Sequence, residues 1–274
     1  MTNDWWADPE TAGVSPGIGS EEMVTPSERR TLDEGGPESG PVLRLAGSRV
    51  TLADRVYLQI RNALMSGQFM PGQTLTIDLL SKQFGVSHMP VREALRRLSA
   101  VEALEVAQNG SARVPLISIE RLSDICTNRL HIESHAAALA AGKNDAVSLA
   151  KLTGIAEAHE DCRQNNEVYR MLELNQHLHF GIYALAGSPI MMQIIENLWL
   201  RHGPYMRLLT DDLVKQIGPN SNLEVGPGHK MLMASLKAGD AAGAATALKS
   251  DILGPYDMLR ELCREYIQAE LDRS

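Results

Sequence analysis

Apolar residues after residue 48 recur at three- and four-residue spacing, which predicts three short helices separated by turn residues. The first helix ends before Gly67, and the second runs from a capping Thr76 to Gly85. The third begins after a capping Ser87, with Pro90 tolerated in its first turn. The positions expected to face inward on the first two helices are Leu52, Val56, Ile60, Ala63, Leu64, Leu79, Leu80 and Phe84.

The predicted third helix has two different faces at 100° per residue. Its packing face carries Val91, Ala94, Leu95 and Leu98. Its opposite face carries His88, Met89, Arg92 and Arg96. A hairpin is expected next, because Asn109-Gly110 separates two short apolar runs. This order predicts a winged helix-turn-helix at 48–116, whose third helix enters the major groove of DNA.

The chain from 117 to 274 continues the helical spacing without strand-like alternation. Glycine and proline interrupt the pattern repeatedly, and we expect breaks at Gly203-Pro204 and at Gly254-Pro255. Six or seven antiparallel helices fit between the interruptions. The predicted fold is therefore mainly α: a winged helix-turn-helix followed by an all-helical antiparallel bundle.

Charge is distributed unevenly along these segments. The whole chain carries a net charge of −8, and residues 1–47 carry −6 in a stretch rich in Gly, Pro and Ser, which predicts a disordered acidic tail. Residues 48–114 carry +3, so the predicted winged helix is where a polyanion would bind. Three widely spaced cysteines give no disulfide framework, and no apolar run is long enough to span a membrane. We expect buried cysteines, a cytoplasmic protein and no membrane partner.

Two runs in the basic segment carry a specific resemblance. They are Gly67-Gln-Phe-Met-Pro-Gly-Gln-Thr-Leu75 and Phe84-Gly-Val-Ser-His-Met-Pro-Val-Arg-Glu-Ala-Leu-Arg-Arg-Leu98. Together they closely resemble the GntR family of bacterial transcription regulators, which implies a partner of double-stranded operator DNA. The residues expected at the DNA are Ser87, His88, Met89, Arg92, Arg96, Arg97, Asn109 and Gly110. An ordinary solvated helix face is the alternative for the three arginines.

The sequence departs from that family pattern at several positions. Family members commonly carry arginine at the position of His88, and some also carry one at the position of Asp78. The segment 107–109 lacks the arginines that often precede the glycine of the wing. Each lost phosphate contact lowers the salt dependence of binding by about one unit, so we expect weaker binding or an altered operator.

The C-terminal segment resembles the ligand-sensing domain of the FadR subfamily, the FCD type. The matching pieces are Arg129-Leu-His-Ile-Glu133, Asn175-Gln-His-Leu-His179, and His229 ahead of Ala238-Gly-Asp240. The resemblance implies a divalent metal, Zn, Ni or Mn, held by Asn175, His179, His229 and Asp251. It also implies that Arg129 holds a small carboxylate effector. The ordinary alternatives are a helical pair without metal and an ion pair between Arg129 and Glu133.

These features predict a homodimeric transcription regulator, and not an enzyme, whose operator affinity is controlled by a small carboxylate bound beside a metal. One alternative is a metal-dependent enzyme with Glu173 or Glu133 as general base, although no catalytic motif supports it. A second alternative is a metal sensor, in which the ion itself is the signal.

Overall fold

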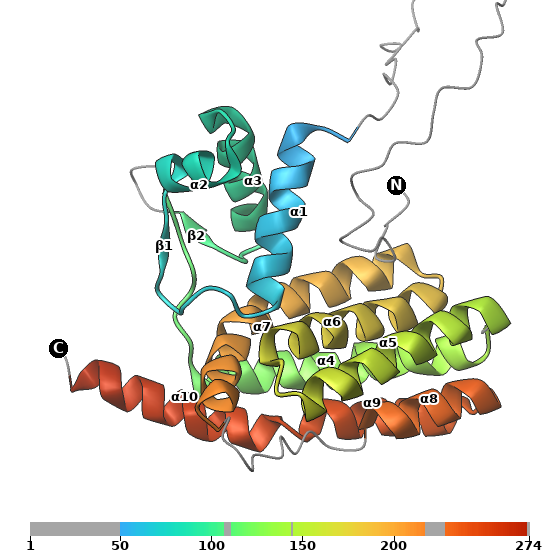
Figure 1. Cartoon of the computed structure of the whole chain (residues 1–274). Coiled ribbons are helices and arrows are strands. Elements are labelled where there is room, and N and C mark those ends of the chain that lie inside the picture. The colour runs from blue at the N-terminus through green and yellow to red at the C-terminus, as the bar shows by residue number, and fades with distance from the viewer. Residues whose placement is uncertain (1–49, 107–110, 144, 217–227, 273–274) are drawn as a thin grey trace, which may run out of the picture. The chain divides into compact units, whose positions relative to one another are not determined.

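The computed structural model describes residues 50–106, 111–143, 145–216 and 228–272, and the expected acidic tail and the tip of the wing lie outside them. Residues 51–274 form one compact unit. Within it, a small N-terminal domain of helices and strands precedes a bundle of helices (Figure 1). The predicted fold class, a winged helix-turn-helix followed by an all-helical bundle, is confirmed.

The N-terminal domain consists of α1 (Leu52–Met65), β1 (Thr74–Leu75), α2 (Ile77–Phe84), α3 (His88–Ala100), β2 (Glu105–Val106) and β3 (Ala112–Arg113). Thr51 and Asp54 form a reciprocal capping box that satisfies free N–H groups at the start of α1. Thr76 caps α2 through the N–H of Leu79. Gly85 ends α2 at φ +65°, a left-handed conformation that glycine adopts without strain.

Three details of this domain differ from the sequence prediction. Ser87 stands at the N-cap of α3, but its side chain makes no capping hydrogen bond. Leu52 and Leu79, both expected to face inward, are 42% and 54% exposed, and on this turn of α2 it is Leu80 that points into the small core. In the antiparallel hairpin Val106 pairs with Ala112, so an odd number of residues, 107–111, separates the two strands. The two-residue turn predicted at Asn109-Gly110 would pair the strands in a different register.

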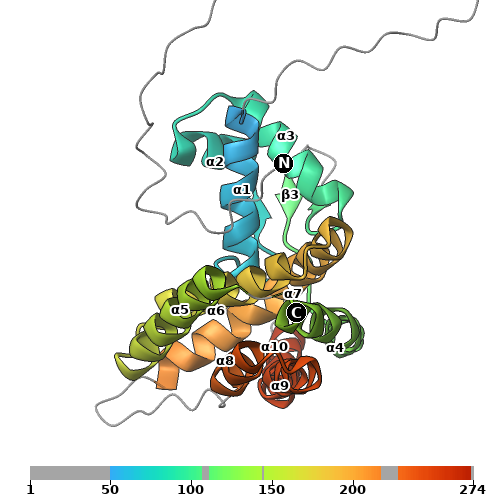
Figure 2. The ribbon, with the colours of Figure 1, turned by 90° about the vertical axis from the view of Figure 1, so that its right-hand side faces the viewer.

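The C-terminal bundle consists of α4 (Ile119–Ala141), α5 (Ala146–Gln164), α6 (Val168–Leu185), α7 (Pro189–Gln216), α8 (Gly228–Ala238), α9 (Ala241–Leu253) and α10 (Tyr256–Leu271). The long α4 packs against α6, α7 and α9, and α5 packs against α6 (Figure 2). The three cysteines, Cys126, Cys162 and Cys263, are buried and free, as expected. No helix in the described ranges is long and apolar enough to cross a membrane.

The two proline sites that were expected to break the bundle behave differently. Gly254-Pro255 separates α9 from α10, as predicted. The break predicted at Gly203-Pro204 is wrong, because α7 continues through Pro204. Leu200 and Leu208, on either side of the proline, are both buried in the bundle, and this packing holds the two halves of α7 in line despite one lost backbone hydrogen bond.

The C-terminal end of α1 rests directly on α7 (Figure 1). A Cβ added at Gly203 would lie only 2.1 Å from the carbonyl oxygen of Leu64, so the two backbones are in close contact. Beside this contact Arg61 pairs with Glu196 at 3.4 Å, and the amide of Gln176 on α6 donates to the sulfur of Met65 at 3.2 Å. The winged helix and the bundle are therefore joined through α7 and α6.

Candidate functional site

The exposed face of α3 starts with the residues that the family resemblance placed at DNA. Ser87, His88 and Arg92 are exposed, and Met89 is 68% exposed. His88 Nε2 lies 3.3 Å from a carboxylate oxygen of Asp78 on α2. The two residues that depart from the family pattern thus face each other, and an acidic group stands where some members carry arginine.

The remaining arginines of α3 have different neighbours. Arg96 is exposed and forms a two-bond pair with Glu93 one turn earlier. Arg97 bonds Asp54 on α1 at 2.8 Å, and its guanidinium lies 4.0 Å above the ring of Tyr57. The structure therefore places Arg97 against α1, where it ties α3 to the domain core. Asn109 and Gly110 of the wing lie outside the described residues.

Three of the four predicted metal ligands come together in the helical domain. His179 on α6, His229 on α8 and Asp251 on α9 each offer a ligand atom, and these atoms lie within 4.8 Å of one another. His179 Nε2 is 3.0 Å from Asp251 Oδ2, and His229 Nε2 is 3.4 Å from His179 Nε2 and 3.6 Å from Asp251 Oδ1. Asn175, one turn before His179 on the same face of α6, is half-buried.

The backbone around this cluster leaves room for the carboxylate of Asp251. Gly228, directly before His229, packs so closely that an added Cβ would lie 2.4 Å from Asp251 Oδ1. Burial opposes the ionisation of Asp251, but the hydrogen bond to His179 and the positive charges of both histidines and Arg129 outweigh it. The pKa of Asp251 is lowered to about 2, so the cluster contains a carboxylate anion.

A buried hydrogen-bonded chain runs from His179 to Arg129 on α4. His179 Nδ1 lies 2.8 Å from the hydroxyl of Tyr183, and that hydroxyl donates to Glu133 Oε2 at 2.6 Å. Arg129 donates to both oxygens of Glu133, at 2.7 and 3.3 Å, and the indole N–H of Trp199 donates to Oε1 at 3.1 Å. Glu133 is completely buried and accepts from all three side chains.

Arg129 thus forms the ion pair with Glu133 that the sequence offered as the alternative to effector binding. Its guanidinium also lies 4.9 Å from the ring centre of Trp199, and its Nη1 is 3.4 Å from Nδ1 of His202. Burial and then the positive charge of Arg129 hold the pKa of His202 well below its usual range, so His202 is a neutral neighbour. Trp199 and His202 both belong to α7, the helix that contacts α1.

The sequence reading did not identify several residues of this site. Tyr183 lies at i+4 from His179, so its place on the same helical face is visible in the sequence once His179 is singled out. His159 on α5 is buried with its ring centre 4.6 Å from that of His229. Burial and the positive charges of His229 and His179 lower the pKa of His159 to about 4. Nothing local in the sequence connects His159 or Trp199 to the cluster.

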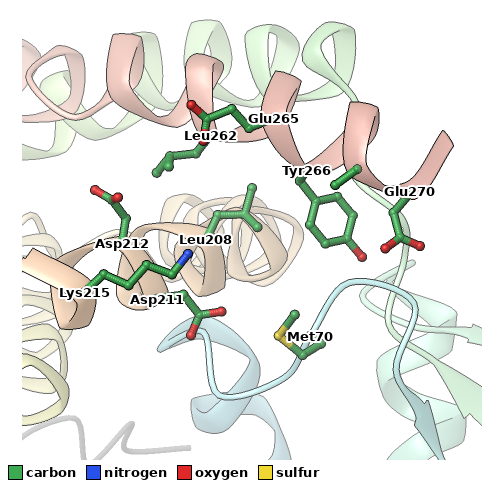
Figure 3. Close-up of a pocket in the computed structure, with 10 residues that line it drawn as sticks. Met70, Leu208, Asp211, Asp212, Lys215, Leu262, Glu265, Tyr266 and Glu270 are labelled. Atoms are coloured by element: carbon green, nitrogen blue, oxygen red, sulfur yellow. The ribbon is translucent and has the colours of Figure 1, made fainter. Parts of the chain in front are cut away.

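A separate cavity of about 310 Å³ lies between α7, α10 and the loop after α1 (Figure 3). Met70 from that loop faces Leu208 on α7 and Tyr266 on α10. The hydroxyl of Tyr266 donates to the carbonyl oxygen of Pro71 at 3.3 Å. The cavity contains none of the predicted site residues, and its walls add a second contact between the winged helix and the bundle.

Comparison with known proteins agrees with both halves of the fold. Residues 52–114 match the model of bacterial regulatory proteins of the gntR family, and residues 124–253 match the FCD domain. The chain is 32% identical to the HTH-type transcriptional regulator McbR of Escherichia coli over 199 residues, which cover 73% of this chain and 88% of McbR. It is 25% identical to the HTH-type transcriptional repressor GlaR of Escherichia coli over 222 residues, 75% of this chain and 94% of GlaR.

The solved structure of Escherichia coli McbR/YncC has the same arrangement, with a TM-score of 0.72 and 30% identity over 78% of this chain and 99% of that chain. These families and relatives are transcriptional regulators rather than enzymes. The alternative of a metal-dependent enzyme therefore has no support. The chain belongs to the GntR family of bacterial transcriptional regulators, in the FadR-type group that joins a helix-turn-helix domain to an FCD domain.

Proposed function

We propose that the helical domain of this regulator binds a divalent metal at His179, His229 and Asp251, with the amide oxygen of Asn175 as a fourth ligand. The observation that carries the proposal is the convergence of three ligand atoms from three helices within 4.8 Å. Two imidazoles, one carboxylate and one amide oxygen form a harder donor set than three imidazoles. This set suits Mn as well as Zn and Ni.

The assignment of donors and acceptors along the buried hydrogen-bonded chain supports this metal site. Glu133 receives hydrogen bonds from Arg129 and Trp199, so its carboxylate acts as an acceptor and the hydroxyl of Tyr183 is the donor to it. The single proton of that hydroxyl is thereby used, and His179 Nδ1 must donate its own proton to Tyr183. Nε2 of His179 then directs a lone pair at Asp251, an anion, unless a proton or a cation lies between them. A proton on Nε2 meets this need in the hydrogen bond to Asp251, and a metal ion that displaces the proton supplies the positive charge in its place.

The small acid that acts as effector is proposed to bind beside the metal, near Arg129. The charge of Arg129 already reaches the cluster, because it contributes to the lowered pKa of Asp251. Glu133 occupies two donors of the guanidinium, so an incoming carboxylate either shares Arg129 with Glu133 or takes its place. The metal would supply the second attachment point for the acid.

Occupation of this site is proposed to reach the DNA-binding domain through α7. Trp199 and His202, which contact the Arg129–Glu133 pair, lie within one turn of Gly203, which supports α1. A shift of α7 by a fraction of an ångström would therefore change how the winged helix is held. In a homodimer that reads two half-sites, such a change alters the spacing of the two recognition helices and with it the affinity for the operator.

The proposed DNA contacts are Ser87, His88, Met89, Arg92 and Arg96, with Asn109 and Gly110 at the wing. We leave Arg97 out of this set because its guanidinium is bonded to Asp54 and lies over Tyr57. Action on chromosomal DNA would place the protein in the bacterial cytoplasm.

The test has two parts. Genomic fragments selected by the purified full-length protein should share a two-fold-symmetric sequence, and operator binding should then respond to metal and to small carboxylates. The variant His179→Ala should lose metal binding and the response while it keeps basal DNA binding. A response to metal with no acid present identifies a metal sensor. Unchanged operator affinity on addition of metal and acid would refute the regulatory part of the proposal.

A further inference from the structure

Glu133 and Tyr183 form a buried pair directly behind the proposed ligand His179. We infer that Glu133 and Tyr183 are positioning residues that fix the proton of His179 on Nδ1 and so prepare its Nε2 to bind the metal. This inference rests on the metal centre proposed above and adds residues that do not touch the ion. It also assigns a direction to each hydrogen bond of the chain.

Glu133 acts only as a hydrogen-bond acceptor in this chain. Its side chain is completely buried and receives hydrogen bonds from the side chains of Arg129, Trp199 and Tyr183. Trp199 can only donate a hydrogen bond, and arginine has no acceptor atom, so both fix Glu133 as the acceptor. The position of the anion is held from two sides, by α4 and by α7.

Tyr183 lies between Glu133 and His179 and passes the direction of the hydrogen bonds from one to the other. The hydroxyl of Tyr183 carries one proton, and the carboxylate of Glu133, which can only accept, lies 2.6 Å from it. The 2.6 Å bond commits that proton to Glu133, which leaves the oxygen lone pairs as acceptors. His179 Nδ1, at 2.8 Å, therefore donates to Tyr183, and Nε2, which faces Asp251 Oδ2 at 3.0 Å, is the nitrogen left for a cation.

A substitution at Glu133 should reverse the direction of the hydrogen bonds along this chain. In Glu133→Gln the amide oxygen is expected at the position of Oε1, where Arg129 and Trp199 both donate, and the amide nitrogen then faces Tyr183 and gives up the longer, 3.3 Å bond from Arg129. The tyrosine would accept from this nitrogen and donate to His179 Nδ1. His179 would then carry its proton on Nε2, the atom that the metal needs.

The experiment compares Tyr183→Phe with Tyr205→Phe in the full-length protein. Tyr205 is a matched control, because it is equally buried and its hydroxyl donates to the carbonyl oxygen of Ser118, away from the cluster. Affinity for Zn²⁺ and Mn²⁺ is measured by competition with a chelator. The protonated nitrogen of His179 is read by ¹⁵N NMR of the metal-free protein, with His179→Ala to assign the signal.

The expected result is a loss of metal affinity of about 10- to 100-fold in Tyr183→Phe, with Tyr205→Phe unchanged. The signal of His179 should show a protonated Nδ1 in the wild-type protein and change in Tyr183→Phe and in Glu133→Gln. The inference is overturned if Tyr183→Phe changes neither the affinity nor the spectrum. If the wild-type protein binds no metal but the spectrum changes as expected, the metal proposal fails while the role of Tyr183 in placing the proton stands.

Discussion

Replacement of Gly203 by alanine should strain the contact between the winged helix and the bundle and destabilise the protein, although alanine favours helices. Gly203 lies inside α7, where an added Cβ would stand 2.1 Å from the carbonyl oxygen of Leu64 at the end of α1. Ordinary contacts of a Cβ begin at about 3.4 Å, so the two backbones must move apart by about 1.3 Å, the difference between these distances. Neither backbone can rotate away as a flexible side chain would.

The size of the effect follows from two opposing terms. Alanine gains up to about 1 kcal/mol over glycine in a helix interior, whereas overpacking of a close contact costs about 1 to 3 kcal/mol. Gly154→Ala is the matched control, because Gly154 lies inside α5 with no other atom within 4 Å of the added Cβ. The gain in helix propensity is shared by both variants, so their difference isolates the contact with Leu64.

The measurement is the free energy of unfolding in urea, followed by circular dichroism, for the wild-type protein and both variants. Gly154→Ala should be stabilised by about 0.5 to 1 kcal/mol. Gly203→Ala should be less stable than Gly154→Ala by about 1 to 3 kcal/mol. Equal stabilisation of the two variants would refute the reasoning, since it would mean that Gly203 does not support α1.

Three further predictions concern other parts of the chain. Capping hydrogen bonds and Arg97 lower the pKa of Asp54 to about 2, so its contribution to stability is present above its ordinary value of 3.8 and is lost as the pH falls through 2. Thermal melting should thus show Asp54→Asn destabilised at pH 7 and close to wild type at pH 2, and an equal deficit at both pH values would contradict this. Gly228→Ala places a Cβ 2.4 Å from Asp251 Oδ1, and chelator competition should show at least about a tenfold loss of metal affinity. Arg92→Ala should weaken operator binding and reduce its salt dependence by about one unit, whereas Arg97→Ala should lower the melting temperature and leave the salt dependence unchanged.

Much of the architecture follows from local rules that the sequence displays. The capping Thr76, the end of α2 at Gly85 and the apolar faces of α1 and α3 are read from the local sequence. The end of α9 at Gly254-Pro255 is predictable for the same reason. Each of these features depends on neighbours within one helical turn, which is the range over which a sequence pattern carries structural information.

The tertiary structure decided the features that depend on contacts between helices. Packing on both sides kept α7 continuous through Pro204, although the local rule predicted a break. The contact with α1 paired Arg97 with Asp54, and the approach of α2 paired Asp78 with His88.

The same division applies to the candidate metal site. The family resemblance named His179, His229 and Asp251 from separate stretches of sequence, and the fold brings them within 4.8 Å. The Arg129–Glu133 pair and the place of Tyr183 one turn after His179 are visible in the sequence, but the Tyr183–Glu133 bond that joins them into one chain is not. Its members come from α4 and α6, and hydrogen-bond directions are set only when donors and acceptors from different helices meet in a buried space. The sequence by itself determined which helices form and which side chains they carry, and the packing of those helices determined which side chains act together.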